Sequence, residues 1–283
     1  IFSQKICTHM VHVMDIHQKT ERIITIIKEH APLVISYSGG VDSTLLAVLA
    51  RESVGADQIV CVFIDGAEVP RRAVSTAKTQ AESLKLPLVI RQGIPLSYEV
   101  QQSNPHDRCK SCKLKTFPIL REIGDEFGYK TIADGANASD VEEYRPGIDA
   151  SSSCGIIHPF IMAGITKEDI RMIAFRMGYA FWNKPSSACL YSRIPYGEEI
   201  TNEKLRMIEK GEELLQNRGI QQARVRHHGT IARIEVMPDD METILLHREE
   251  ISLFFKNLGF SYITLDLQGY RSGSMDEALH FSS

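Results

Sequence analysis

Short apolar segments alternate with longer stretches of helical periodicity from residue 19 to about residue 184. The apolar segments are nearly continuous, which is typical of parallel strands that are buried on both faces. We expect strands at 33–37, 58–64, 87–91 and 130–133. Helices are predicted at 20–29, 43–53, 70–85, 111–127 and 166–177, with a long loop before residue 107 and a polar loop from 134 through 147. The alternation predicts an α/β fold, a parallel sheet covered by helices on both faces.

The pattern changes after Pro195-Tyr196-Gly197. Helices at 201–217 and 239–257 and strands at 223–227, 231–236 and 261–266 predict a smaller α+β unit, with a hairpin turn at 228–230. We therefore expect an α/β domain over 19–194 and a C-terminal α+β domain over 195–283 for substrate binding or oligomerisation. Residues 1–18 are interpreted as a leader, with His9-Met10 as a candidate cloning scar.

Composition narrows the class of protein. The chain has 283 residues, of which 43% are hydrophobic and 24% charged, as in ordinary globular proteins. The net charge of −4 argues against broad nucleic-acid binding, so no nucleic-acid partner is expected. No apolar run is long enough to span a membrane, and the leader lacks the pattern of a signal peptide. We expect a cytoplasmic protein whose six cysteines are thiols or metal ligands.

The segment 33–44 predicts a strand, a glycine turn and a helix in direct succession. Glycines let backbone N–H groups turn inward, and a helix N-terminus favours an anion. The predicted nucleotide-binding residues of this loop are Ser38, Gly39, Gly40, Asp42, Ser43 and Thr44. Asp42 cannot itself bind phosphate, so we expect it to hold Mg²⁺. No lysine follows the glycines, and the loop therefore resembles the PP-loop of ATP pyrophosphatases; the alternative is a plain helix cap.

A second small-residue segment, 134–140, follows the last predicted strand of the sheet. Gly135 and Asn137 are predicted to form another wall of the nucleotide site, and the alternative is a solvated turn. Arg145, a little further on, is suited to bidentate binding of phosphate or carboxylate.

Cys109 and Cys112 form a CxxC motif at the mouth of a predicted helix, among basic residues. A helix N-terminus and basic neighbours lower thiol pKa values, so we expect these thiols to deprotonate readily. The motif fits a redox disulfide, a zinc site completed by His106, or an iron–sulfur cluster with Cys189 as its third ligand. Cys61 is expected in the core, and Cys154 is expected to be incidental.

Arginines recur near and within the second unit. Arg224 and Arg226 alternate on one strand face, and Arg271 lies in a glycine-rich loop. The candidate residues for binding a substrate phosphate or carboxylate are Arg145, Arg193, Arg224, Arg226 and Arg271. Glu235 and Asp266 are expected to pair with these arginines, the alternative being a metal site.

Together these motifs resemble the LarE family, the ATP-dependent sulfur transferases of nickel-pincer nucleotide biosynthesis. The resemblance covers about residues 20–280, in Ser38–Thr44, Cys109–Cys112, Asp134–Asn137, Tyr144–Gly147, Lys184–Cys189, Ser192–Gly197, Arg224–His228, Ala232–Glu235 and Asp266–Gly273. It implies that ATP adenylates a carboxylate of pyridinium-3,5-biscarboxylic acid mononucleotide, and that sulfur then displaces AMP to leave a thiocarboxylate. It also implies a sulfide donor and a homo-oligomer, hexamers being one form in the family.

The resemblance further bears on the source of sulfur. One LarE subtype sacrifices a single cysteine, whereas another holds a [4Fe–4S] cluster through a CxxC and one later cysteine. Cys109, Cys112 and Cys189 match the second pattern, so the implied cofactors are ATP, Mg²⁺ and this cluster. One departure is His158-Pro-Phe160, where many relatives have Ser-Pro-Leu. The alternatives are a PP-loop tRNA thiolase, or a non-catalytic nucleotide-binding iron–sulfur or zinc sensor.

Overall fold

The parallel sheet predicted from the sequence is present. The computed structural model describes residues 15–94, 103–142, 146–185, 189–271 and 274–275. Its first sheet contains β1 (Leu33–Ser36), β2 (Ile59–Asp65), β3 (Leu88–Gln92) and β4 (Thr131–Ala133) in the order β3-β2-β1-β4. Each neighbouring pair is parallel, so all four strands end at the same edge, where ligands of such sheets bind. The predicted α/β class is confirmed.

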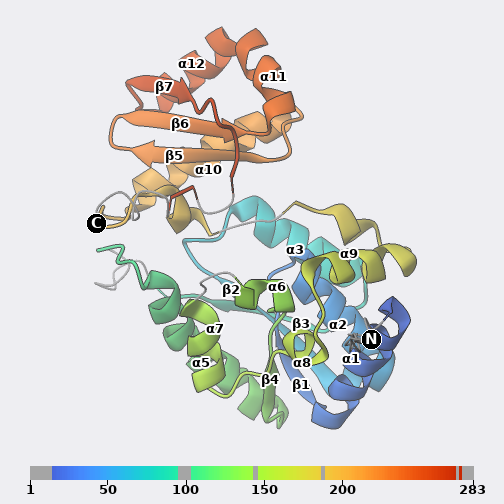
Figure 1. Cartoon of the computed structure of the whole chain (residues 1–283). Helices are drawn as coiled ribbons and strands as arrows, with labels where there is room; N and C mark the ends of the chain where they lie inside the picture. Colours follow the sequence, from blue (N-terminus) through green and yellow to red (C-terminus); the bar gives the residue numbers. More distant parts are fainter. Residues whose placement is uncertain (1–14, 95–102, 143–145, 186–188, 272–273, 276–283) are drawn as a thin grey trace, which may run out of the picture.

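Helices cover both faces of this sheet (Figure 1). One face packs against α1 (Ile16–His30), α2 (Val41–Val54), α3 (Arg71–Ser83) and α9 (Lys167–Arg176). The other packs against α5 (Arg108–Phe127). Strand residues alternate between the two cores: Ile35 lies in the first and Val34 in the second. Cys61 of β2 is fully buried in the first core, as predicted.

The polar loop predicted through residue 147 is wrong. The structure has α6 (Ala138–Glu142) and α7 (Pro146–Ser153) there, and α8 (Pro159–Ala163) follows. These helices are short, and α7 lacks an apolar stripe, so the sequence gives no helical period. The serine hydroxyls of α7 bond back to the helix itself: Ser151 donates to the Gly147 carbonyl (2.7 Å) and Ser152 to that of Ile148 (3.0 Å).

The C-terminal unit is a three-stranded mixed sheet covered by helices (Figure 1). It comprises α10 (Asn202–Asn217), β5 (Ala223–His228), β6 (Ile231–Val236), α11 (Met241–Leu246), α12 (Arg248–Leu258) and β7 (Tyr262–Leu265). β5 and β6 form the predicted antiparallel hairpin, and β7 adds in parallel to β6. The single helix predicted over 239–257 is divided, because His247 leaves helical geometry (φ −100°, ψ 15°) between α11 and α12.

The core of the C-terminal unit also takes in side chains that precede residue 195. Leu190, Tyr191 and Ile194, from the 3₁₀ helix η3 (Leu190–Arg193) and its end, pack with α10 and the mixed sheet. The division at residues 194 and 195 stays a prediction, and the leader lies largely outside the described residues. Among the helices that the structure describes, none combines the length and apolarity needed to cross a membrane.

Candidate active site

The glycine turn between β1 and α2 is held by its own hydroxyl groups. Ser43 Oγ accepts from the Ser38 backbone N–H (3.1 Å) and lies 3.0 Å from Ser38 Oγ. Gly39 has a φ of 69°, and a Cβ there would lie 2.8 Å from Ala77 Cβ, so only glycine fits. Ser38 is exposed, whereas Thr44 is fully buried and its hydroxyl contacts Gln80 (3.1 Å) and Tyr37 (3.5 Å). The loop therefore presents Ser38 and the start of α2 to a ligand, with Thr44 behind it.

Lys184 supplies a cation to this turn from far along the chain. Its Nζ donates to the Gly39 carbonyl (2.7 Å) and to Gln80 Oε1 (3.1 Å). Burial lowers the pKa of Lys184 below its ordinary value. An ammonium group has three donors, so one remains after these two bonds. The sequence assigns Lys184 no role beyond its place in a motif. Its contact with Gly39 joins segments that are far apart in the chain, so no local pattern reveals it.

The loop after β4 lies directly against the start of α2. A Cβ on Gly135 would lie 2.8 Å from the Ser43 backbone nitrogen, and Asn137 Nδ2 donates to Asp42 Oδ2 at 3.4 Å. Gly135 and Asn137 thus adjoin the loop, as their predicted role requires. Arg145 lies outside the described residues.

A buried network that the sequence did not reveal begins at Asp134. His158 Nδ1 lies 2.6 Å from Asp134 Oδ1, and Lys113 Nζ lies 3.5 Å from Oδ2. Burial opposes ionisation of Asp134, but the hydrogen bond from His158 and the charge of Lys113 outweigh it, so its pKa is lowered. Lys113 follows Cys112 directly, so this network anchors the start of α5 to the end of β4.

The three predicted thiols occupy one region. Cys109 and Cys112 lie in the first turns of α5, and Cys189 immediately precedes η3. After burial and the charge of Glu68, the neighbouring Cys112 raises the pKa of Cys189, and Cys109 raises the pKa of Cys112 in the same way. All three are free thiols.

The predicted ready deprotonation of the CxxC thiols is wrong for Cys112. Partial burial, followed by the charge of Glu68, raises the pKa of Cys112 to about 11, whereas Cys109 and Cys189 are exposed at the surface. Lys113 and Lys115 do act in the predicted direction on Cys112, but burial outweighs them. Glu68 follows β2, and its carbonyl accepts from the Leu190 N–H at 2.8 Å. Sequence reasoning missed Glu68 because this contact joins segments that are far apart in the chain.

Thiols are the ligands that iron–sulfur clusters require, so the side chains of this region are chemically suited to such a cluster. Cys112 lies within electrostatic reach of both Cys109 and Cys189, and the Tyr191 hydroxyl is buried without a hydrogen-bond partner among the described residues. The His106 ring lies against the Tyr196 ring instead (centroids 4.5 Å apart), which does not favour it as a fourth zinc ligand. Within the described ranges, no three His, Cys, Asp or Glu side chains lie close enough together to hold a single metal ion. The thiols therefore share a region without being closed around one ion.

The predicted arginines take different positions. Arg193 is buried and forms a two-point ion pair with Glu212 (2.8 and 3.2 Å), while Arg224 lies over the Tyr270 ring. Arg226 pairs with the fully buried Glu235 (2.7 Å), and Arg271 Nη1 lies 3.7 Å from Asp266. The expected ion pairing of Glu235 and Asp266 is confirmed.

Two neighbouring cavities connect these parts. One, of about 360 Å³, extends from Ser38 and Gly39 past Lys184 to Arg193 and Arg224. The other, of about 480 Å³, lies at the carboxyl ends of β2 and β3, and side chains of α10 line its opposite side. Residues that line both are Arg71, Leu190 and Glu209. The phosphate-type loop, Arg193, Arg224 and Leu190 thus border adjoining spaces, whereas Arg226 and Arg271 line neither.

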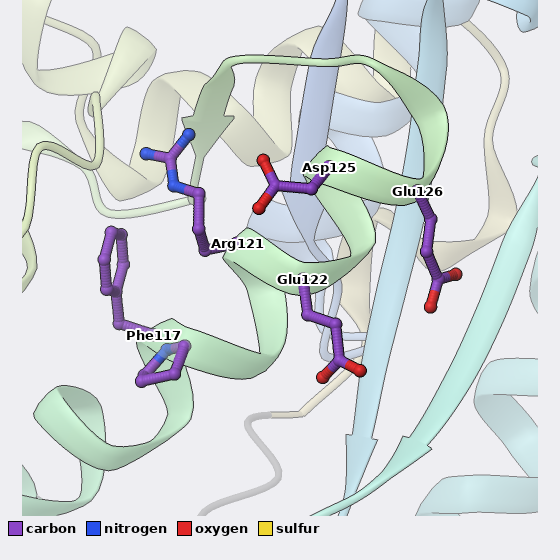
Figure 2. A pocket seen from close by; sticks show the side chains of 6 residues that line it. Phe117, Arg121, Glu122, Asp125 and Glu126 are labelled. Atoms are coloured by element: carbon purple, nitrogen blue, oxygen red, sulfur yellow. The ribbon is translucent and has the colours of Figure 1, made fainter.

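A further cavity, of about 540 Å³, runs along α5 (Figure 2). All its lining residues belong to that helix, among them Phe117 and Arg121, whose guanidinium carbon lies 5.4 Å from the ring centroid. Figure 2 shows the carboxylates of Glu122, Asp125 and Glu126 further along the same helix. None of the predicted site residues lines this cavity.

The phosphate-type loop at the end of β1 defines the class of protein. Residues 18–107 match the NAD synthase family model. The chain is 34% identical over 93% of its length to an uncharacterized protein of Synechocystis, covering 99% of that protein. It is 33% identical over 85% of its length to an uncharacterized protein of Methanocaldococcus jannaschii, covering 91% of it. With this loop and sheet, the chain is an enzyme of the ATP pyrophosphatase class.

The finer assignment comes from a relative with a named activity. The chain is 30% identical over 92% of its length to the pyridinium-3,5-bisthiocarboxylic acid mononucleotide synthase of Lactiplantibacillus plantarum, covering 95% of that protein. The chain belongs to this family, the LarE sulfur transferases.

Proposed function

We propose that this protein adenylates the carboxylates of pyridinium-3,5-biscarboxylic acid mononucleotide and converts them to thiocarboxylates. The likeness to the Lactiplantibacillus plantarum synthase along nearly its whole length supports this substrate. The observation that carries the proposal is the cavity that joins Ser38 and Gly39 to Arg193 and Arg224. One space then offers a phosphate-binding loop at one end and the guanidinium group of Arg224 for an anionic substrate at the other, with Arg193 held beside it by Glu212.

The chemistry has two steps for each carboxylate. A carboxylate oxygen attacks the α-phosphorus of ATP, and pyrophosphate leaves. Sulfur then attacks the acyl carbon, and AMP leaves with the former carboxylate oxygen. In this proposal the loop at 38–44 binds the departing pyrophosphate, and Asp42 would hold the Mg²⁺ that shares its charge; the position of Asp42 in the first turn of α2 supports this role.

Cys109, Cys112 and Cys189 are proposed to hold a [4Fe–4S] cluster. The electrostatic reach of Cys112 to both Cys109 and Cys189 supports this. When bound, such a cluster supplies an iron with an open position that can carry an extra sulfide. Iron and acid-labile sulfide in equal amounts in anaerobically purified protein would support the cluster, and stoichiometric zinc would contradict it.

The test of the whole function is pyrophosphate release from ATP and Mg²⁺ with and without the carboxylated pyridinium mononucleotide. We expect release only with the substrate, together with a thiocarboxylate product identified by mass spectrometry. Tight nucleotide binding without turnover would favour a sensor instead.

Self-association is also proposed. Light scattering would measure the oligomeric state. The proposal is supported by exposed apolar residues of the C-terminal unit, which are Leu245, Leu246, Leu253, Tyr262 and Leu267.

Lys184 is expected to bind the nucleotide phosphates. In Lys184→Met the stem is kept and the ammonium group is lost, so we expect the KM for ATP to rise about tenfold to a hundredfold, the range for a hydrogen bond to a charged group. Steady-state pyrophosphate release measures this. Lys78→Met, an exposed position on α3 that lines neither cavity, is the matched control. An unchanged KM in the Lys184 variant would exclude the contact.

A further inference from the structure

Tyr191 carries a hydroxyl group that the described structure leaves without a partner. Its ring packs in the C-terminal core and its side chain is only 4% exposed. The hydroxyl oxygen is buried and forms no hydrogen bond with any described residue. A buried polar group without a partner costs free energy, so native proteins retain few of them. Such a group at the edge of an active site indicates a ligand that the hydroxyl binds.

The surroundings of this hydroxyl are those of the thiol region. Glu68, Cys189 and Cys112 all act on it electrostatically, in that order of strength. The backbone holds the region together, because the Leu190 N–H donates to the Glu68 carbonyl at 2.8 Å. Leu190, between Cys189 and Tyr191, lines both cavities. The orphaned hydroxyl therefore belongs to the residue that follows Leu190, between the thiol region and the two cavities that Leu190 lines.

The chemistry of the hydroxyl limits what it can bind. A phenol O–H is a hydrogen-bond donor at neutral pH, and the orphaned donor calls for an acceptor. The negative charge of Glu68 disfavours a large polyanion such as a phosphate group. A small, soft acceptor such as hydrosulfide suits a hydroxyl that lies between an apolar core and neighbouring thiols.

We propose that the Tyr191 hydroxyl binds and positions a small sulfur species of the hydrosulfide class beside Cys112 and Cys189. This inference rests on the proposed function, since it names the residue that holds the sulfur before transfer. Tyr191 then acts as a positioning residue: it fixes the sulfur by one hydrogen bond and takes part in neither adenylation nor Mg²⁺ binding.

The test is Tyr191→Phe in the full-length protein, purified anaerobically. Protein is incubated with sodium sulfide and desalted, and the sulfide retained per chain is measured together with its iron content. We expect sulfide retention and the rate of thiocarboxylate formation each to fall about tenfold, the factor for one hydrogen bond to a charged acceptor. Substrate-dependent pyrophosphate release for the first carboxylate should stay within about twofold of the wild type, since the hydroxyl does not contact the nucleotide loop.

Thermal unfolding separates this role from a structural one. Removing an orphaned buried hydroxyl relieves its desolvation cost, so the Tm of Tyr191→Phe should equal or exceed that of the wild type. Tyr262→Phe, at an exposed position on β7, is the matched control and should change none of these readouts. Wild-type sulfide retention in Tyr191→Phe would overturn the inference, and so would a lowered Tm with loss of pyrophosphate release. A wild-type protein that retains sulfide but never acts on the pyridinium substrate would refute the proposed function and leave this inference standing.

Discussion

Replacing Asp42 by asparagine is expected to reduce pyrophosphate release by at least a hundredfold. A carboxylate at this position can hold Mg²⁺ against the phosphates, whereas an amide of the same shape is a much poorer ligand for a hard cation. A metal ion stabilises the charge of such transition states by several kcal/mol. A loss of about 2.7 kcal/mol of this stabilisation lowers the rate a hundredfold. The measurement is the rate of pyrophosphate release at saturating ATP and substrate.

The fold should tolerate this change. Asp42 is half-buried in the first turn of α2, where an acidic side chain contributes about 0.3–1 kcal/mol through the helix dipole, so the Tm should fall by only a few degrees. Asp57→Asn, at an exposed site in the 3₁₀ helix η1 (Ala56–Gln58) beyond the C-terminal end of α2, is the control and should keep full activity. Pyrophosphate release at the wild-type rate in Asp42→Asn would remove Asp42 from the mechanism. Partial recovery at high Mg²⁺ would support its role as a metal ligand.

The parts of the fold that the sequence predicted well are those set by local pattern. Continuous apolar strands such as 58–64 can only be buried on both faces, and the turn at 38–44 follows from its glycines. Helices α7 and α8 were missed because each is too short to show a period, and their stability comes from packing on longer elements. The division at His247 escaped prediction because neither proline nor glycine marks it.

The candidate site was predictable only as far as its motifs reach. The sequence placed Cys109 and Cys112 at a helix start, but helix dipoles and lysines were a poor guide to thiol pKa values. Partial burial and Glu68 govern the pKa of Cys112, and both depend on tertiary contacts. The contact of Lys184 with Gly39 and the orphaned hydroxyl of Tyr191 are invisible in the sequence for the same reason. Residues that carry a motif were found, whereas residues that act through spatial proximity were not.

Cys189→Ser should separate the two chemical steps completely. We expect pyrophosphate release in the first turnover to stay within about threefold of the wild type, because Asp42 and the loop at 38–44 are untouched. Thiocarboxylate formation should fall below detection, at least a hundredfold, because the sulfur supply is lost. Cys154→Ser, at the end of α7, is the matched control and should keep both steps. Thiocarboxylate formed at the wild-type rate by Cys189→Ser would eliminate Cys189 from sulfur transfer.

The same assay decides how the sulfur is supplied. If three thiolates hold one cluster, Cys109→Ser and Cys112→Ser should lose thiocarboxylate formation as fully as Cys189→Ser, with iron and acid-labile sulfide lost together. If Cys189 instead gave up its own sulfur, the two CxxC variants would remain active. The wild-type chain would then lose the mass of one H₂S and stop after a single turnover. Several turnovers per chain with added sulfide, at unchanged protein mass, are expected, because the three thiols lie together and an open iron can be recharged.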